Sequence, residues 1–137
     1  MRFLFVDRVL GHEPGRWIRA GHTISGAEGL LAGPCLVVEA LAQAAGWLIT
    51  ASTGFTRRGL PLSIRSIRLT RPVEAGESVL LEAEIVGHCG ADGGMLFVIN
   101  RLGAQVGTIR LTDPDAFGFT GECEVVFSFA GSHGRAL

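Results

Sequence analysis

The residues best suited to chemistry lie in one apolar stretch in the first half of the chain, residues 34–49. Glu39 is the only acidic residue of this stretch, and Gln43 follows it by four positions, which places both on one face of a helix. Burying an unpaired carboxylate among apolar side chains is costly, so Glu39 is the first candidate for a catalytic acid or base. A structural carboxyl is the alternative for Glu39. Gln43 either binds substrate or acts as a hydrogen-bonding spacer for the helix.

Cys35 stands near the start of the same stretch, directly after Gly33 and Pro34. A thiol at a helix N-terminus can act as a nucleophile in acyl transfer, because the positive end of the helix favours the thiolate. No histidine or other base lies beside Cys35 in the sequence. We therefore favour its ordinary role as a small buried residue.

One long helix and a set of strands must position these residues. Gly33-Pro34 is typical of a helix start, and we expect the helix to run to about Ser52. Its residues are apolar on nearly every face, so we expect other elements to cover it all round. Turn residues bound the segments with strand character, which are 3–10, 16–24, 62–69, 79–86, 95–102 and 105–111, and 117–137 can add another. This pattern predicts an α+β domain, with a first hairpin turning at 12–15 and a β-bulge within 62–69 that curls the sheet around the helix.

The length and charge limit the classes of function. A chain of 137 residues suits one domain over residues 1–137. The net charge is −1, and the positive residues are all arginines scattered among acidic ones, which argues against a nucleic-acid partner. The three cysteines are widely spaced without a CxxC pair, so we expect no metal site and no disulfide framework.

The apolar segments are too short for export or for membrane insertion. Asp7 and Arg8 interrupt the N-terminal apolar run, which also lacks a small-residue cleavage site. The stretch 34–49 falls short of the roughly 20 residues that span a bilayer. We expect a cytoplasmic protein without a membrane partner.

Three stretches carry a family resemblance: Phe-Val-Asp-Arg-Val at 5–9, Pro-Cys-Leu-Val-Val-Glu-Ala-Leu-Ala-Gln-Ala-Ala-Gly at 34–46, and Arg-Pro-Val-Glu-Ala-Gly-Glu at 71–77. In order and spacing they resemble signatures of the bacterial 3-hydroxyacyl-carrier-protein dehydratases of the FabA/FabZ type. The resemblance covers about residues 3–112 and leaves 113–137 as an extra C-terminal segment. It implies a hot-dog fold, in which an antiparallel sheet wraps one long helix, and a dimer whose two sheets join side by side. It also implies an acyl thioester that enters between the subunits on the pantetheine arm of acyl-carrier protein or coenzyme A, with no further cofactor.

The same resemblance assigns roles to particular residues. Such enzymes use a histidine of one subunit and an acidic residue on the partner's long helix, because one group takes the α-proton while another helps the β-hydroxyl to leave. Glu39 matches the acidic residue, and the backbone N–H groups of Cys35 and Leu36 match the site of the thioester carbonyl. The family's histidine lies just before the helix, where this chain has 30–34, a shorter passage without histidine. His22, in the second expected strand, is the nearest upstream candidate.

We therefore expect a FabA/FabZ-like protein of fatty-acid or polyketide-type metabolism that binds acyl thioesters but has an incomplete dehydratase site. The alternatives are an active dehydratase that uses His22, a heterodimer that lends Glu39 to a His-bearing homologue, a thioesterase that uses Glu39, and a plain interaction module. Five arginines flank or lie on the third expected strand and either dock an acidic carrier protein or phosphate or form a solvated face: Arg57, Arg58, Arg65, Arg68 and Arg71.

Overall fold

A computed structural model describes residues 6–24, 33–71, 73–74, 76–89, 95–105 and 117–131. Its elements are β1 (Arg8–Glu13), β2 (Trp17–Thr23), α2 (Gly33–Ser52), β3 (Arg57–Leu69), β4 (Ser78–Cys89), β5 (Met95–Gln105) and β6 (Phe117–Gly131). The strands form one sheet in the order β1-β2-β4-β5-β6-β3, and every neighbouring pair is antiparallel.

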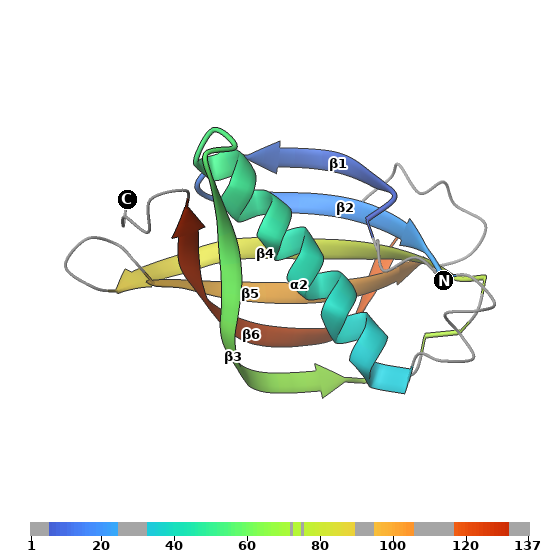
Figure 1. The fold of residues 1–137 in the computed structure, drawn as a ribbon. Coiled ribbons are helices and arrows are strands. Elements are labelled where there is room, and N and C mark those ends of the chain that lie inside the picture. Colours follow the sequence, from blue (N-terminus) through green and yellow to red (C-terminus); the bar gives the residue numbers. More distant parts are fainter. Residues whose placement is uncertain are drawn as a thin grey trace.

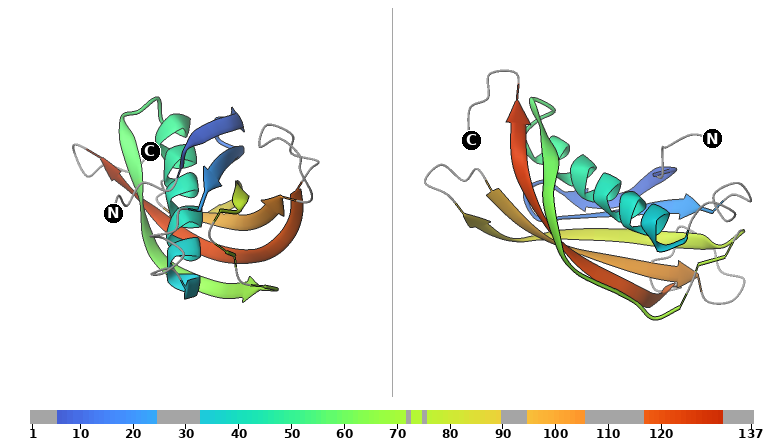
Figure 2. Two further views of the ribbon diagram at one scale, coloured as in Figure 1. Left: turned by 90° about the vertical axis from the view of Figure 1, so that its right-hand side faces the viewer. Right: turned by 60° about the horizontal axis from the view of Figure 1, so that its bottom comes forward.

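The helix α2 lies across one face of the sheet, and the sheet curls around it (Figure 1). Two turned views show the curl, in which the β3 and β6 strands bend upward beside the C-terminal half of the helix (Figure 2). Register shifts in β3 between Pro61 and Ser63 and between Ile64 and Ser66 mark β-bulges, which increase the local bend of a strand. The expected α+β hot-dog fold, with one long helix wrapped by an antiparallel sheet, is confirmed.

Alternation of side chains along the strands creates the core between sheet and helix. In β5, Leu96, Val98, Asn100 and Leu102 are buried against the helix side, while the alternate residues Phe97, Ile99 and Arg101 are only partly buried. The helix contributes a buried side of its own, made of Ala40, Leu41, Ala44, Ala45, Leu48 and Ile49. Short alanines let the helix approach the sheet closely, and the larger buried residues beside them complete the packing.

The C-terminal end of α2 is fixed by its own residues and by the first hairpin. Gly54 and Phe55 adopt left-handed backbone conformations, with φ angles of 62° and 64°, which stop the helix. Ser52 Oγ donates a hydrogen bond to the Leu48 carbonyl and accepts one from the Gly15 N–H of the β1–β2 turn, each over 2.6 Å. This end of the helix is therefore tied to the hairpin.

Most expected elements are confirmed, with changes at their ends. The helix has the expected bounds, the bulge lies where the alternation changes, and part of 117–137 forms β6, which lies inside the sheet between β5 and β3. The first turn was placed too early, because β1 continues through His12 and Glu13, where Glu13 pairs with Trp17 and accepts a hydrogen bond from its indole. The expected strand 105–111 lies outside the described residues apart from Gln105, the last residue of β5.

No helix in the part of the chain that the structure describes is both long and apolar enough to cross a membrane.

Candidate functional site

The start of α2 places backbone donors where the family resemblance expects a thioester carbonyl. Cys35 and Leu36 are the third and fourth residues of the helix. The first four N–H groups of a helix have no partner within it, and the helix dipole adds partial positive charge at this end. The backbone of Cys35 and Leu36 therefore lies where it can stabilise a developing negative charge on an oxygen. Their side chains lie outside the described residues.

Glu39 and Gln43 lie one helical turn further on and form a pair. The Gln43 Nε2 donates a hydrogen bond to Glu39 Oε1 over 3.3 Å, and Glu39 is exposed. The side of the helix opposite the core is open within this chain, and Trp47 on that side is 44% exposed. A carboxylate with an amide donor beside it, close to free N–H groups, can accept a hydrogen bond or a proton from a polar group of a ligand.

The expectation that the helix is covered all round is therefore wrong for a single chain. The sheet covers one side of α2, while Glu39 and Trp47 stay in contact with solvent. The sequence did not reveal which side of the helix is buried, because alanine occurs on buried and exposed sides alike. An alanine-rich helix therefore lacks a clear 3.6-residue spacing of apolar residues.

His22 is buried in the sheet and held by a carboxylate. It is 3% exposed on β2, on the same side of the strand as Ile18 and Ala20 of the core. Its Nδ1 lies 3.0 Å from Asp7 Oδ1, and Asp7 Oδ2 accepts the Thr23 N–H over 2.8 Å. This arrangement fastens the chain before β1 to β2 and fixes the orientation of the ring.

The structure does not bring His22 and Glu39 together within one chain. His22 lies on the sheet face that α2 covers, whereas Glu39 lies on the outer side of α2. Asp7 was missed as a partner because the sequence shows it only as the end of an apolar run. Its position in the Phe-Val-Asp-Arg-Val signature was the available signal.

The edge strand β3 exposes an apolar stripe. The strand β3 is paired on one side only, with β6. Four of its apolar side chains are exposed to solvent: Leu60 (44%), Leu62 (56%), Ile64 (44%) and Ile67 (51%). An unpaired, long and apolar edge is a template for pairing with another chain.

The outer face of the sheet carries ion pairs between arginine and glutamate side chains. Arg68 binds Glu122 over 2.8 Å, and Arg101 binds Glu82 over 3.1 Å. Arg65 instead lies 5.1 Å from the centre of the Phe97 ring. The ion pairs of Arg68 and Arg101 agree better with a solvated sheet face than with a surface for an anionic carrier, since these two arginine charges already have partners.

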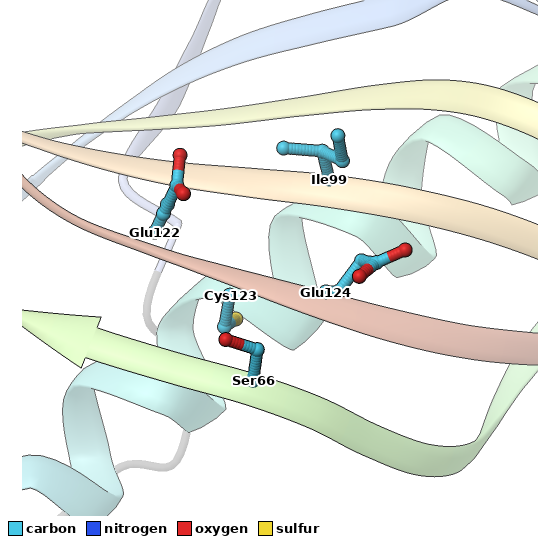
Figure 3. Close-up of a pocket in the computed structure, with 5 residues that line it drawn as sticks. All are labelled: Ser66, Ile99, Glu122, Cys123 and Glu124. Carbon is cyan, nitrogen blue, oxygen red and sulfur yellow. The ribbon is translucent and has the colours of Figure 1, made fainter.

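A small cavity of about 70 Å³ opens between β3, β5 and β6 and is lined by Ser66, Ile99, Glu122, Cys123 and Glu124 (Figure 3). Burial, and to a lesser extent the charge of Glu122, raises the pKa of the Cys123 thiol to about 11, so the thiol is neutral near pH 7.

The described residues hold no group of three or more His, Cys, Asp or Glu side chains that could bind a metal ion.

Comparison with known proteins places the chain in a family. It is 33% identical over 128 residues to the 3-hydroxyacyl-(acyl-carrier-protein) dehydratase FabZ of Symbiobacterium thermophilum, a match that covers 83% of this chain and 89% of that protein. The chain belongs to the FabZ family. It is 35% identical over 96 residues to the FabZ of Blochmanniella pennsylvanica, where the match covers 61% of this chain and spans 64%, less than two thirds, of that relative. No family model matches the chain.

Solved structures confirm the fold of this FabZ-family chain. A Streptococcus mutans protein bound to acetyl coenzyme A has a TM-score of 0.66 at 15% identity and covers 90% of this chain and 88% of its own. A Staphylococcus aureus acyl-CoA hydrolase in complex with butyryl coenzyme A also has a TM-score of 0.66, at 9% identity, with 88% and 69% covered. At these identities the likeness is one of fold.

Proposed function

We propose that this FabZ-family chain binds acyl thioesters, carried by acyl-carrier protein or coenzyme A, at a dehydratase-like site that is incomplete. The exposed Glu39–Gln43 pair, one turn after the free N–H groups of the helix start, carries the proposal. The N–H groups of Cys35 and Leu36 hold the thioester carbonyl, and the Glu39 carboxylate accepts a hydrogen bond from the 3-hydroxyl. Relatives named as dehydratases and a fold neighbour bound to acetyl coenzyme A support this ligand class.

The site lacks a second proton carrier. Dehydration needs one group to remove the α-proton and another to protonate the leaving hydroxyl. The sequence from 23 to 38 contains no histidine. His22 is 3% exposed within the sheet, and its Nδ1 is held by Asp7, so its ring does not face a site on a partner's helix. Glu39 supplies only one of the two functions, so the unaided chain binds the thioester without dehydrating it.

The working unit is a dimer formed through the β3 edge. Pairing two copies of β3 satisfies the free side of the strand and covers the apolar stripe of Leu60, Leu62, Ile64 and Ile67. The same edge could instead pair with a His-bearing homologue, in which case Glu39 completes a composite dehydratase site.

A thioesterase is the second candidate function. The likeness to an acyl-CoA hydrolase and the exposure of Glu39, which leaves room for a water molecule beside the carboxylate, favour it. In that reaction Glu39 would remove a proton from water while the helix-start N–H groups stabilise the oxyanion.

Calorimetric binding of 3-hydroxybutyryl-pantetheine and butyryl-pantetheine tests the proposed site. We expect the wild type to bind the hydroxylated thioester about tenfold more tightly, because a hydrogen bond to a charged group contributes about 1.5 kcal/mol. Glu39→Gln should remove most of this preference, while Glu124→Gln, on the outer face of the sheet, should keep it. If neither thioester binds, or if the preference survives in Glu39→Gln, the proposed site is wrong.

A further inference from the structure

The edge strand β3 is positively charged from end to end. It contains no acidic residue, and its positive residues are Arg57, Arg58, Arg65 and Arg68. Its one neighbour in the sheet, β6, contributes two acidic residues, Glu122 and Glu124, and no positive one. This edge therefore holds four positive charges against two negative ones, beside the apolar stripe that the proposed dimer covers.

Three of these arginines have no carboxylate partner in the part of the chain that the structure describes. Arg68 is paired with a glutamate of β6, whereas Arg65 lies against the ring of Phe97 and Arg58 is exposed. The Nη1 of Arg57 is buried and has no hydrogen-bond acceptor. A buried guanidinium donor without an acceptor costs folding free energy, and an acceptor supplied from outside the chain would remove that cost.

Pairing two copies of β3 brings like charges together. A two-fold axis at the middle of the apolar stripe, near Ser63 and Ile64, sets Arg58 of one strand beside the end of the other strand that carries Arg68. Side chains that face each other across an antiparallel pair lie about 5 Å apart, and like charges there are destabilising. A second copy thus buries the stripe against a repulsion, whereas an acidic strand buries it with an attraction.

We propose that β3 pairs by preference with the edge strand of a different chain, a homologue of the same fold that carries acidic residues where this chain carries arginines. Carboxylates of that strand pair with Arg58 and Arg65 and supply an acceptor for Nη1 of Arg57. A homologue fits because the Glu39 site lacks a second proton carrier, which another subunit of this fold can supply. The inference rests on the proposed dimer through β3 and names its preferred partner; a second copy pairs at the same edge more weakly.

Protection of the edge is the competing role of these arginines. Charged residues on an edge strand discourage pairing with any other strand. Arginines that only protect an edge belong in water, whereas Arg57 is half-buried and its Nη1 is fully buried. The four exposed apolar side chains of the stripe also favour a strand that is covered by a partner.

A charge-reversed copy of this chain serves as the acidic partner in the test. It carries Arg58→Glu and Arg65→Glu, which change two exposed arginines without a carboxylate partner among the described residues and leave the apolar stripe intact. The control copy carries Arg8→Glu and Arg16→Glu, which make the same change in net charge beside the opposite edge of the sheet. Fluorescently labelled wild type is titrated with unlabelled wild type, with the charge-reversed copy and with the control copy, and anisotropy reports pairing.

The charge-reversed copy should bind the labelled chain about tenfold more tightly than the wild type does, because exposed ion pairs replace repulsion across the edge. In about 1 M salt the two should bind alike, since exposed charges are then screened within about 3 Å. The control copy should bind like the wild type at both salt concentrations.

Each other result overturns the inference in a recognisable way. Equal binding of the charge-reversed copy and the wild type at low salt would leave the arginines with a protective role. Tighter binding by the control copy as well would mean that net charge alone decides. Absence of pairing in all three titrations would overturn the dimer through β3 too, while thioester binding by the same wild type still decides the proposed site. If the charge-reversed copy does not fold, Arg58→Glu alone is judged by the same criteria, with an expected gain of about threefold.

Discussion

Replacing two apolar residues of the β3 edge should dissociate the proposed dimer. Leu62 and Ile67 are 56% and 51% exposed in the single chain, so each has about half of its surface left to bury against a partner. Complete burial of such a side chain contributes about 1.5–3 kcal/mol, so half contributes about 1 kcal/mol. In a symmetric dimer each of the two chains contributes both residues, so four side chains are buried at the interface. The double variant Leu62→Ser with Ile67→Ser should therefore lose about 4 kcal/mol of association free energy, about a thousandfold in the dissociation constant.

Sedimentation velocity over a range of concentrations measures this loss. The matched control is Val86→Ser, which alters a residue of similar exposure, 49%, on β4 inside the sheet. We expect the control to dimerise as the wild type does. A double variant with the dissociation constant of the wild type, or a wild type that is monomeric at every concentration, would refute pairing through β3.

Three further substitutions test the packing and the charge states of the fold. Gly121→Ala should lower the free energy of unfolding by about 1–3 kcal/mol, because a Cβ there would lie 2.7 Å from the backbone oxygen of Arg68, which cannot move aside as a side chain can; an unchanged denaturation midpoint would contradict this contact. The free energy of unfolding should fall as the pH rises from 9.0 to about 11, because the unfolded thiol of Cys123 ionises before the folded one. A Cys123→Ala variant should lose that part of the decline, and identical pH curves would exclude the thiol as its source. Asp7→Asn should destabilise the fold by about 1–3 kcal/mol in urea, since the amide cannot accept both from the Thr23 N–H and from the ring of His22; equal stability would show that these bonds contribute nothing.

The fold could be predicted from the sequence because its signals are local. Gly33-Pro34 gives the start of α2 through the backbone preferences of these two residues, and the change of alternation in 62–69 marks the bulges of β3. The position of β6 in the sheet order could not be derived in this way. Pairing between these strands joins residues that are far apart in the sequence, and the residues of β6 alone do not indicate that β5 and β3 are its neighbours.

The candidate site was predicted less completely. The sequence singled out Glu39 and placed Gln43 on the same face of a helix, and the structure shows the hydrogen bond between them. It did not show that Glu39 is exposed, because the direction of a helix face depends on where the sheet lies. The carboxylate partner of His22 and the unpartnered amide of Asn100 also escaped notice, since both are defined by strand register and burial. The roles of Cys35 and Leu36 in binding stay predictions.

One incubation tests the central claim most directly. Purified chain is mixed with a 3-hydroxyacyl-pantetheine thioester, binding is measured by calorimetry, and the absorbance of the conjugated enoyl thioester is followed in the same sample. The proposed incomplete site predicts that the thioester binds and that no enoyl product accumulates above the rate without protein. Steady enoyl formation would show a complete dehydratase site, and absence of binding would show that the chain does not use its FabZ-like site for acyl thioesters.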